Sequence, residues 1–199
     1  MSKGLFDGSQ TLYIHTGNAK SMVASVQFAE KHGIKRKVII GGGQALHVAD
    51  FLVKHKVPLI LTKIHQTPAR EDDDLDLPFR MPYLLDQAGV DFCIGYSQTM
   101  TALKRNLPFQ AGTAAAYGLD KEKAVSMITL NTARILGIDD QVGSLEVGKQ
   151  ATLFVSKGDA LDMRGNGPTH IFIDGANVPL EGMQERLFNR YRARYGHGD

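Results

Sequence analysis

The sequence predicts an α/β fold with a parallel sheet. Four short runs of apolar, β-branched residues recur along the first half of the chain, at residues 11–15, 37–41, 58–62 and 91–95. Each run is continuously apolar rather than alternating, which is typical of parallel strands that are covered on both faces. Segments with helical spacing of apolar residues lie between the runs. This alternation predicts right-handed βαβ units.

The helices between the strands have recognisable ends. Asn18 is a suitable N-cap for a first helix that Gly33 ends. A second helix is expected after Gly43, and a third across residues 82–88, ended by Gly89. The second rests on apolar residues at helical spacing, namely Ala45, Leu46, Ala49, Leu52 and Val53.

The chain changes character after the fourth strand. Residues 106–137 read as helices only, with Asp120 as an N-cap and Gly137 as a C-cap. Short strands follow at 151–156 and 170–175, and a smaller one at 177–180. Because Gly-rich turns flank them, the two longer strands are expected to pair with each other rather than extend the parallel sheet.

We therefore divide the chain into residues 1–140, 141–181 and 182–199. The last part contains a basic amphipathic helix over 182–195. Its arginines could face an anionic partner, but a solvated helix face is the simpler interpretation.

Composition excludes several classes of protein. Lys and Arg number 23 against 21 Asp and Glu, so no nucleic-acid partner is expected. One Cys cannot build a disulfide framework. No apolar run reaches the roughly 18 residues of a membrane span, and the first residues lack the apolar core of a signal peptide. We expect a soluble protein, cytoplasmic by default, with a small-molecule substrate and no membrane partner.

The number of strands poses a geometric problem. A (β/α)₈ barrel needs eight strands and about 250 residues, whereas this chain supplies about four βα units. Four parallel strands also leave two unpaired edges. We expect either an open α/β sheet or half of a barrel that pairs with another copy or a missing N-terminal half, and hence a homo-oligomer if no such half is present.

The segment from 131 to 155 carries the most specific signal. The residues that form its pattern, with Thr129 just before it, are Thr129, Asn131, Ala133, Leu136, Gly137, Gly143, Ser144, Leu145, Gly148, Lys149 and Ala151. This pattern resembles the C-terminal signature of the amidohydrolase superfamily, in the imidazolonepropionase-like branch, although Thr152 replaces the usual Asp. Residues 114–129 and 171–175 fit the same resemblance.

The resemblance implies part of a (β/α)₈ metal-dependent hydrolase barrel, strands five to eight, plus C-terminal β-sandwich strands. Complete members of the family hold zinc and hydrolyse non-peptide C–N bonds. By the resemblance, His15 at the end of the first strand corresponds to a metal-ligand histidine. The family's H-x-H motif does not occur in this sequence.

Two further positions depart from the family pattern. Gly41–Gly43 stand where a second ligand histidine is expected, and Gly95-Tyr96-Ser97 where a Gly-x-Asp is expected. A catalytic zinc needs about three protein ligands. The interpretation is an amidohydrolase-like protein with an incomplete metal site in this chain, so we expect neither a tightly bound transition metal nor amidase activity from the chain alone. The alternative is a non-catalytic binding or assembly module on the same fold.

Other residues are weaker candidates. Lys63, His65 and Ser97 follow strand ends and are candidates for lining a pocket. The loop 63–78 is long for a βα connection, and its acidic run at 72–74 reads as solvated. A third hypothesis is an open α/β phosphate-binding domain that uses Gly41–Gly43. The simpler interpretation of these glycines is a tight turn between a strand and a helix. His32 and His55 read as structural, and Cys93 as an inert core residue.

Overall fold

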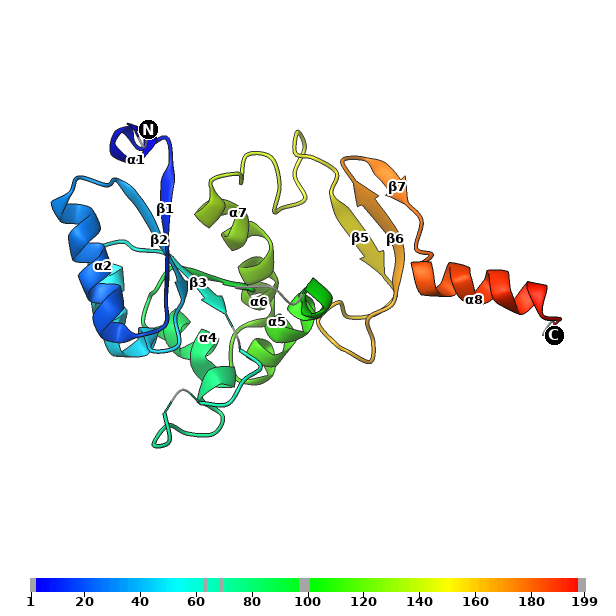
Figure 1. The fold of residues 1–199 in the computed structure, drawn as a ribbon, viewed down its shortest axis with the longest axis horizontal. Coiled ribbons are helices and arrows are strands. Elements are labelled where there is room, and N and C mark those ends of the chain that lie inside the picture. The colour runs from blue at the N-terminus through cyan, green and yellow to red at the C-terminus, as the bar shows by residue number, and fades with distance from the viewer. Residues whose placement is uncertain (1–2, 63, 69, 97–100, 197–199) are drawn as a thin grey trace.

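The computed structural model describes residues 3–62, 64–68, 70–96 and 101–196. Within them, four parallel strands form one sheet in the order β1-β2-β3-β4 (Figure 1). The strands are β1 (Thr11–Thr16), β2 (Arg36–Gly41), β3 (Leu59–Thr62) and β4 (Phe92–Gly95). Each predicted run forms a strand, so the expected parallel α/β architecture is confirmed.

The predicted helix ends are largely confirmed. The Asn18 side chain accepts a hydrogen bond from the Ser21 N–H at 3.2 Å and begins α2 (Ala19–Lys31). Asp120 accepts one from the Lys123 N–H at 2.9 Å and begins α6 (Lys121–Ile128). Gly137 ends α7 (Leu130–Leu136) with a left-handed φ of 74°. These caps satisfy backbone groups that a helix end leaves without partners.

Two predicted helices differ in detail. The segment after Gly43 divides into a 3₁₀ helix, η1 (Ala45–Val48), and α3 (Ala49–Lys54), because Val48 leaves helical geometry with a φ of −130°. The third helix, α4 (Leu77–Gln87), begins five residues before Pro82, the predicted start. Pro78 occupies the first turn, where proline is favoured, and Pro82 lies inside the helix.

Other elements complete the first part of the chain. A short helix, α1 (Lys3–Asp7), precedes β1. The 3₁₀ helix η2 (Thr101–Asn106) leads into α5 (Leu107–Ala116), which packs against α6. Among the described helices, none combines the length and the apolar composition that a membrane crossing requires.

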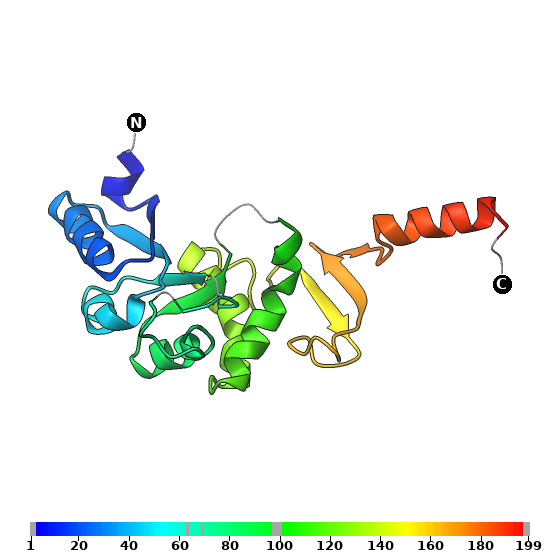
Figure 2. The ribbon, with the colours of Figure 1, turned by 60° about the horizontal axis from the view of Figure 1, so that its bottom comes forward.

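The two faces of the sheet are covered unequally. One face carries the main core, where Ile39, Leu59 and Phe92 pack with apolar residues of α2 to α6 (Figure 2). In parallel strands, residues in register point to the same face. The opposite face therefore carries the row Tyr13 and Val38 and the row that includes His15.

The chain itself seals this second face only over β2, β3 and β4. Ile135 of α7 is 5% exposed and packs with Val38, Cys93 and Ile60 in a small separate cluster. Tyr13 and His15 of β1 share rows with these residues, but Tyr13 is 37% exposed and His15 is also exposed. The second face is thus covered beside α7 and open along β1.

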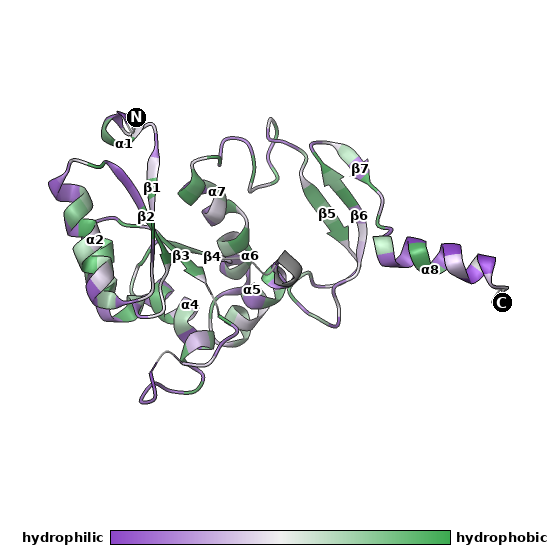
Figure 3. Ribbon diagram, in the orientation of Figure 1, coloured by the Kyte–Doolittle hydropathy of each residue, from purple (hydrophilic) through white to green (hydrophobic). Residues whose placement is uncertain are grey.

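A second, three-stranded sheet follows the helices. It contains β5 (Leu153–Ser156), β6 (Pro168–Ile173) and β7 (Ala176–Val178), paired antiparallel in that order. The predicted pairing of the two longer strands is confirmed. The final helix, α8 (Met183–Arg194), extends away from both sheets and mixes apolar and polar residues along its length (Figure 3).

The Ile135 contact gives a stability prediction. Ile135→Ala should lower the free energy of unfolding by about 2–4 kcal/mol, because it leaves a cavity over Val38 and Cys93. Leu136→Ala, a neighbouring change at a side chain that is 40% exposed, should cost less than about 1 kcal/mol. Urea denaturation measures both.

The reactivity of Cys93, the one cysteine of the chain, tests the same contact with Ile135. Cys93 is 1% exposed, and burial raises the pKa of its thiol to about 11. A disulfide reagent should therefore react slowly with the folded chain and faster with Ile135→Ala than with Leu136→Ala. Equal rates and equal stabilities in the two variants would show that α7 does not seal this face.

Candidate functional site

The carboxyl ends of the four strands meet at one edge of the sheet, where barrel enzymes place their reactive groups. His15 lies one residue before the end of β1, in register with Ile40 of β2. Its side chain is exposed on the open face, and it has no hydrogen bond or ion pair with the part of the chain that the structure describes. Both ring nitrogens are therefore available to a ligand or substrate.

The glycine run at the end of β2 is a tight turn against β1. Gly41 has a φ of 129°, and a Cβ there would collide with the Thr16 carbonyl. Gly42 donates its N–H to Thr16 O at 3.2 Å, and Gln44 donates to Gly17 O at 2.9 Å. Ala45 donates to Gly42 O at 3.0 Å. With these three amides engaged, the turn offers few donors to a phosphate, and the tight-turn interpretation is favoured.

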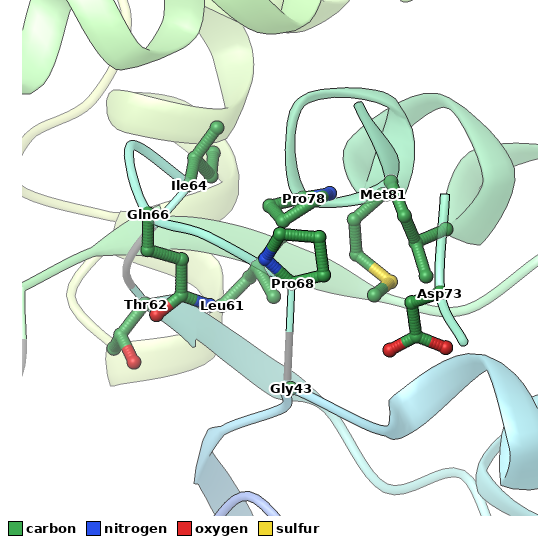
Figure 4. Close-up of a pocket in the computed structure, with 10 residues that line it drawn as sticks. Gly43, Leu61, Thr62, Ile64, Gln66, Pro68, Asp73, Pro78 and Met81 are labelled. Atoms are coloured by element: carbon green, nitrogen blue, oxygen red, sulfur yellow. The ribbon is translucent and has the colours of Figure 1, made fainter. Parts of the chain in front are cut away.

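A small pocket lies beside this turn, at the end of β3. Its cavity of about 20 Å³ has room for about one water molecule, not for a substrate. The polar side chains around it are Thr62, Gln66 and Asp73, and Figure 4 shows the ring of Pro68 at the centre of the lining residues. Thr62 is 5% exposed and donates to the Gly41 carbonyl at 3.4 Å. The pocket thus lies between the end of β3 and the loop that follows it.

His65, a predicted pocket residue, instead contacts α5. Its Nε2 lies 2.7 Å from the Thr113 hydroxyl, which donates its own proton to the Phe109 carbonyl at 3.0 Å. The His65 Nε2–H is therefore the donor in the first contact. Burial lowers the pKa of His65, which favours the neutral ring, and Phe79 packs edge-on against it. His65 fixes the loop on α5.

The acidic run in the same loop is paired locally. Arg70 donates to both carboxylate oxygens of Asp72, at 2.9 and 2.8 Å, and its backbone N–H donates to Asp73 at 3.2 Å. The hydrogen bond between the two side chains raises the pKa of Arg70 and lowers that of Asp72. Arg80 lies 3.6 Å from Asp74. Arg70 and Arg80 thus pair with carboxylates of this run at the exposed surface of the loop.

A family-type zinc does not fit the described residues. They contain no group of three or more His, Cys, Asp or Glu side chains that could hold a metal ion. Of the strand ends, β1 supplies His15, whereas β2 and β4 end in Gly41 and Gly95. Two other predicted residues, Lys63 and Ser97, lie outside the described residues.

Sequence reasoning missed two features of this edge. Thr113 and Phe79 hold His65, but they come from helices 14 to 48 residues away and no local pattern joins them. Gln110 of α5 is 2% exposed, and its Oε1 has no hydrogen-bond partner among the residues that the structure describes. In the sequence, only its position on an otherwise apolar helix face could have indicated that Gln110 is buried.

Comparison with known proteins agrees with the fold. The sequence profile of the amidohydrolase family matches residues 79–181, more than half of the chain, so the chain belongs to this family. The crystal structure of an amidohydrolase from Thermotoga maritima MSB8 is 26% identical, with a TM-score of 0.79. The match covers 89% of this chain and 45% of that one.

Two further relatives are deaminases. A 5-methylthioadenosine/S-adenosylhomocysteine deaminase of Teredinibacter turnerae is 43% identical over 60 residues, which is 30% of this chain and 12% of that protein. The structure of an adenosine deaminase from Xanthomonas campestris, with bound zinc, is 18% identical, with a TM-score of 0.58. That match covers 98% of this chain and 53% of the other. The chain thus spans about half the length of the solved structures it matches.

The glycine turn gives a second prediction. Gly41→Ala should destabilise the fold by about 3 kcal/mol or more, because it combines a forbidden φ with a backbone collision. Gly33→Ala is the matched control: its φ of 72° is also positive, but the new Cβ has open space, so about 1 kcal/mol is expected. Thermal unfolding measures the difference, and equal losses would refute the close approach of the two turns.

His65 gives a prediction about pH. Because its folded-state pKa lies below the ordinary 6.5, the unfolded chain takes up the proton more readily. Stability from the neutral ring is present above pH 6.5 and is lost as the pH falls from 6.5 toward the lowered pKa. His65→Gln should flatten this part of the pH profile of the unfolding free energy, whereas His170→Gln on exposed β6 should not. Profiles that change equally would contradict it.

Proposed function

We propose that this chain forms the C-terminal half of an amidohydrolase barrel that hydrolyses a non-peptide C–N bond of a small molecule. The observation that carries the proposal is His15, an exposed and unpartnered imidazole at the carboxyl end of β1, on the sheet face that the chain leaves open. The motif at 129–155 supports the imidazolonepropionase-like branch. Two matched proteins are deaminases by name, and deamination by water is hydrolysis of this bond class.

In this proposal the chain's residues bind and orient the substrate. His15 offers a donor and an acceptor toward the barrel interior, and the locked turn at Gly41–Gly42 fixes the neighbouring wall. No step is assigned to a metal, because the described residues supply one ligating side chain at this edge where about three are needed. Any further ligands would have to come from outside the described residues.

A second candidate function has its own support. The ends of β2 and β4 are glycines, which cannot ligate a metal or move a proton. This favours a non-catalytic binding or assembly module that retains the barrel architecture. The two candidates differ in whether a completed barrel hydrolyses anything.

We further propose that the chain self-associates when no complementary half is present. The open face exposes Tyr13 and His15, and both outer strands of the sheet lack a neighbour within the described residues. Light scattering at micromolar concentration should give a mass at or above twice 21.8 kDa. A mass near 21.8 kDa would contradict this.

Complementation tests the catalytic proposal. The N-terminal half of the Thermotoga maritima amidohydrolase would be mixed with this chain, and hydrolysis measured on adenosine and 5-methylthioadenosine, the compounds in the names of the two matched deaminases. We expect no turnover by the chain alone, turnover by the complex, and loss of at least about tenfold in His15→Ala but not in His170→Ala.

The outcomes separate the candidates. A complex that forms, binds these substrates and hydrolyses none of them would replace the catalytic proposal with the non-catalytic one. Turnover or stoichiometric zinc in the isolated chain, lost in His15→Ala, would show that the metal site is complete here after all.

A further inference from the structure

A basic pocket lies at the opposite end of the sheet from His15. Its cavity of about 320 Å³ is bounded by the amino ends of β1, β2 and β4, the turn before β3, and α7. Five Lys and Arg side chains line it against one carboxylate, Asp91, although the whole chain carries a formal charge of only +2. The cationic residues are Lys35, Arg36, Lys37, Lys56 and Arg134.

Two of these cations are already engaged. Lys37 Nζ lies 3.2 Å from Glu30, and the same carboxylate lies 3.0 Å from His55 Nδ1. The hydrogen bond to His55 is the main cause of the lowered pKa of Glu30. Lys35 donates to the Asp7 carbonyl at 3.3 Å. The single carboxylate of Glu30 is thus shared and leaves no charge for the rest of the pocket.

The other three cations have no ion pair or side-chain hydrogen bond within the described residues. They are Arg36, Lys56 and Arg134. Burial raises the pKa of Asp91 and the charge of Arg134 opposes that shift, but the two groups form no ion pair within 4 Å. Arg134 also acts through its charge on Glu146, so two carboxylates partly offset these cations. The remaining excess of positive charge is self-repulsive, and a bound anion would relieve it.

Two of the three are held in place by the backbone. Arg36 Nη2 lies against Gly137, only 2.7 Å from where a Cβ would stand, so the absence of a side chain admits the guanidinium to the end of α7. Lys56 has a φ of 50° because it follows α3 in a left-handed cap, in which the Val57 N–H donates to the Leu52 carbonyl at 3.0 Å.

The pocket's shape and floor select the class of ligand. Val38 and Ile135, at 3% and 5% exposure, form an apolar floor beside Arg36, Lys56 and Arg134, which are themselves exposed. A volume of about 320 Å³ suits a small molecule rather than an extended polymer. One guanidinium group can donate two parallel hydrogen bonds to phosphate oxygens, and a lysine ammonium adds a further positive charge.

We propose that this pocket binds a small anion that carries a phosphoryl group, through Arg36, Lys56 and Arg134. The site is separate from the carboxyl edge and does not depend on hydrolytic activity there. Its ligand would be a phosphorylated metabolite or an inorganic phosphate species.

Calorimetric titration of the full chain with inorganic phosphate, pyrophosphate and acetate tests the proposal. We expect saturable one-to-one binding of pyrophosphate or phosphate and none of acetate. Arg134→Ala and Lys56→Gly should each weaken binding by about tenfold or more. Arg186→Ala on α8 and Lys20→Ala on α2, which remove exposed cations elsewhere, should change it less than about twofold.

Lys56→Gly separates binding from folding. Glycine relieves the positive φ, so this variant should keep or gain thermal stability while losing affinity. Absence of saturable phosphate or pyrophosphate binding, or equal losses in the control variants, would overturn the proposal. So would binding of heparin without binding of either small anion, which would mark a non-specific charged surface.

Discussion

The structure depends on one constraint: a parallel sheet needs cover on both faces, and this chain covers one face fully and the other only over β2 to β4, leaving β1 open. Helices α2 to α6 build the main core on the first face. On the second face Ile135 seals Val38 and Cys93, while Tyr13 and His15 remain exposed. The chain belongs to the amidohydrolase family and spans about half the length of the solved structures it matches.

The two ends of the sheet therefore have different chemistry. The carboxyl edge holds one available histidine beside a turn that is fixed by backbone hydrogen bonds, and two arginines pair with part of its acidic loop. The amino edge gathers cations around an apolar floor, with few carboxylates to balance them. A reaction centre at the first edge needs groups from elsewhere, whereas the second pocket is built from this chain alone.

Much of the fold could be predicted from local chemistry. The continuous apolar runs predicted the four strands, and Asn18, Asp120 and Gly137 marked helix ends because their side chains or lack of one suit those positions. The predicted helix start at Pro82 was wrong. Pro78, not Pro82, occupies the first turn of α4, and Pro82 lies inside the helix. The split at Val48 depends on the packing of the glycine turn, which no periodicity reports.

The sites were harder to predict than the fold. The position of His15 followed from the strand end and the family resemblance, but the contact of His65 with Thr113 is tertiary. The basic pocket draws Arg36, Lys56 and Arg134 from three distant segments, so no linear motif announces it. Each lysine and arginine taken singly reads as an ordinary surface charge.

Hydrogen exchange at β1 tests the central claim most directly. If the chain is half of a barrel, the amides of residues 11–16 should exchange faster than those of residues 36–41 in dilute solution, because one side of β1 has no neighbouring strand. Addition of a complementary half should slow exchange at 11–16 and leave 36–41 unchanged. Equal and full protection of both strands in a dilute monomer would contradict the account, since β1 would then be covered within the chain itself.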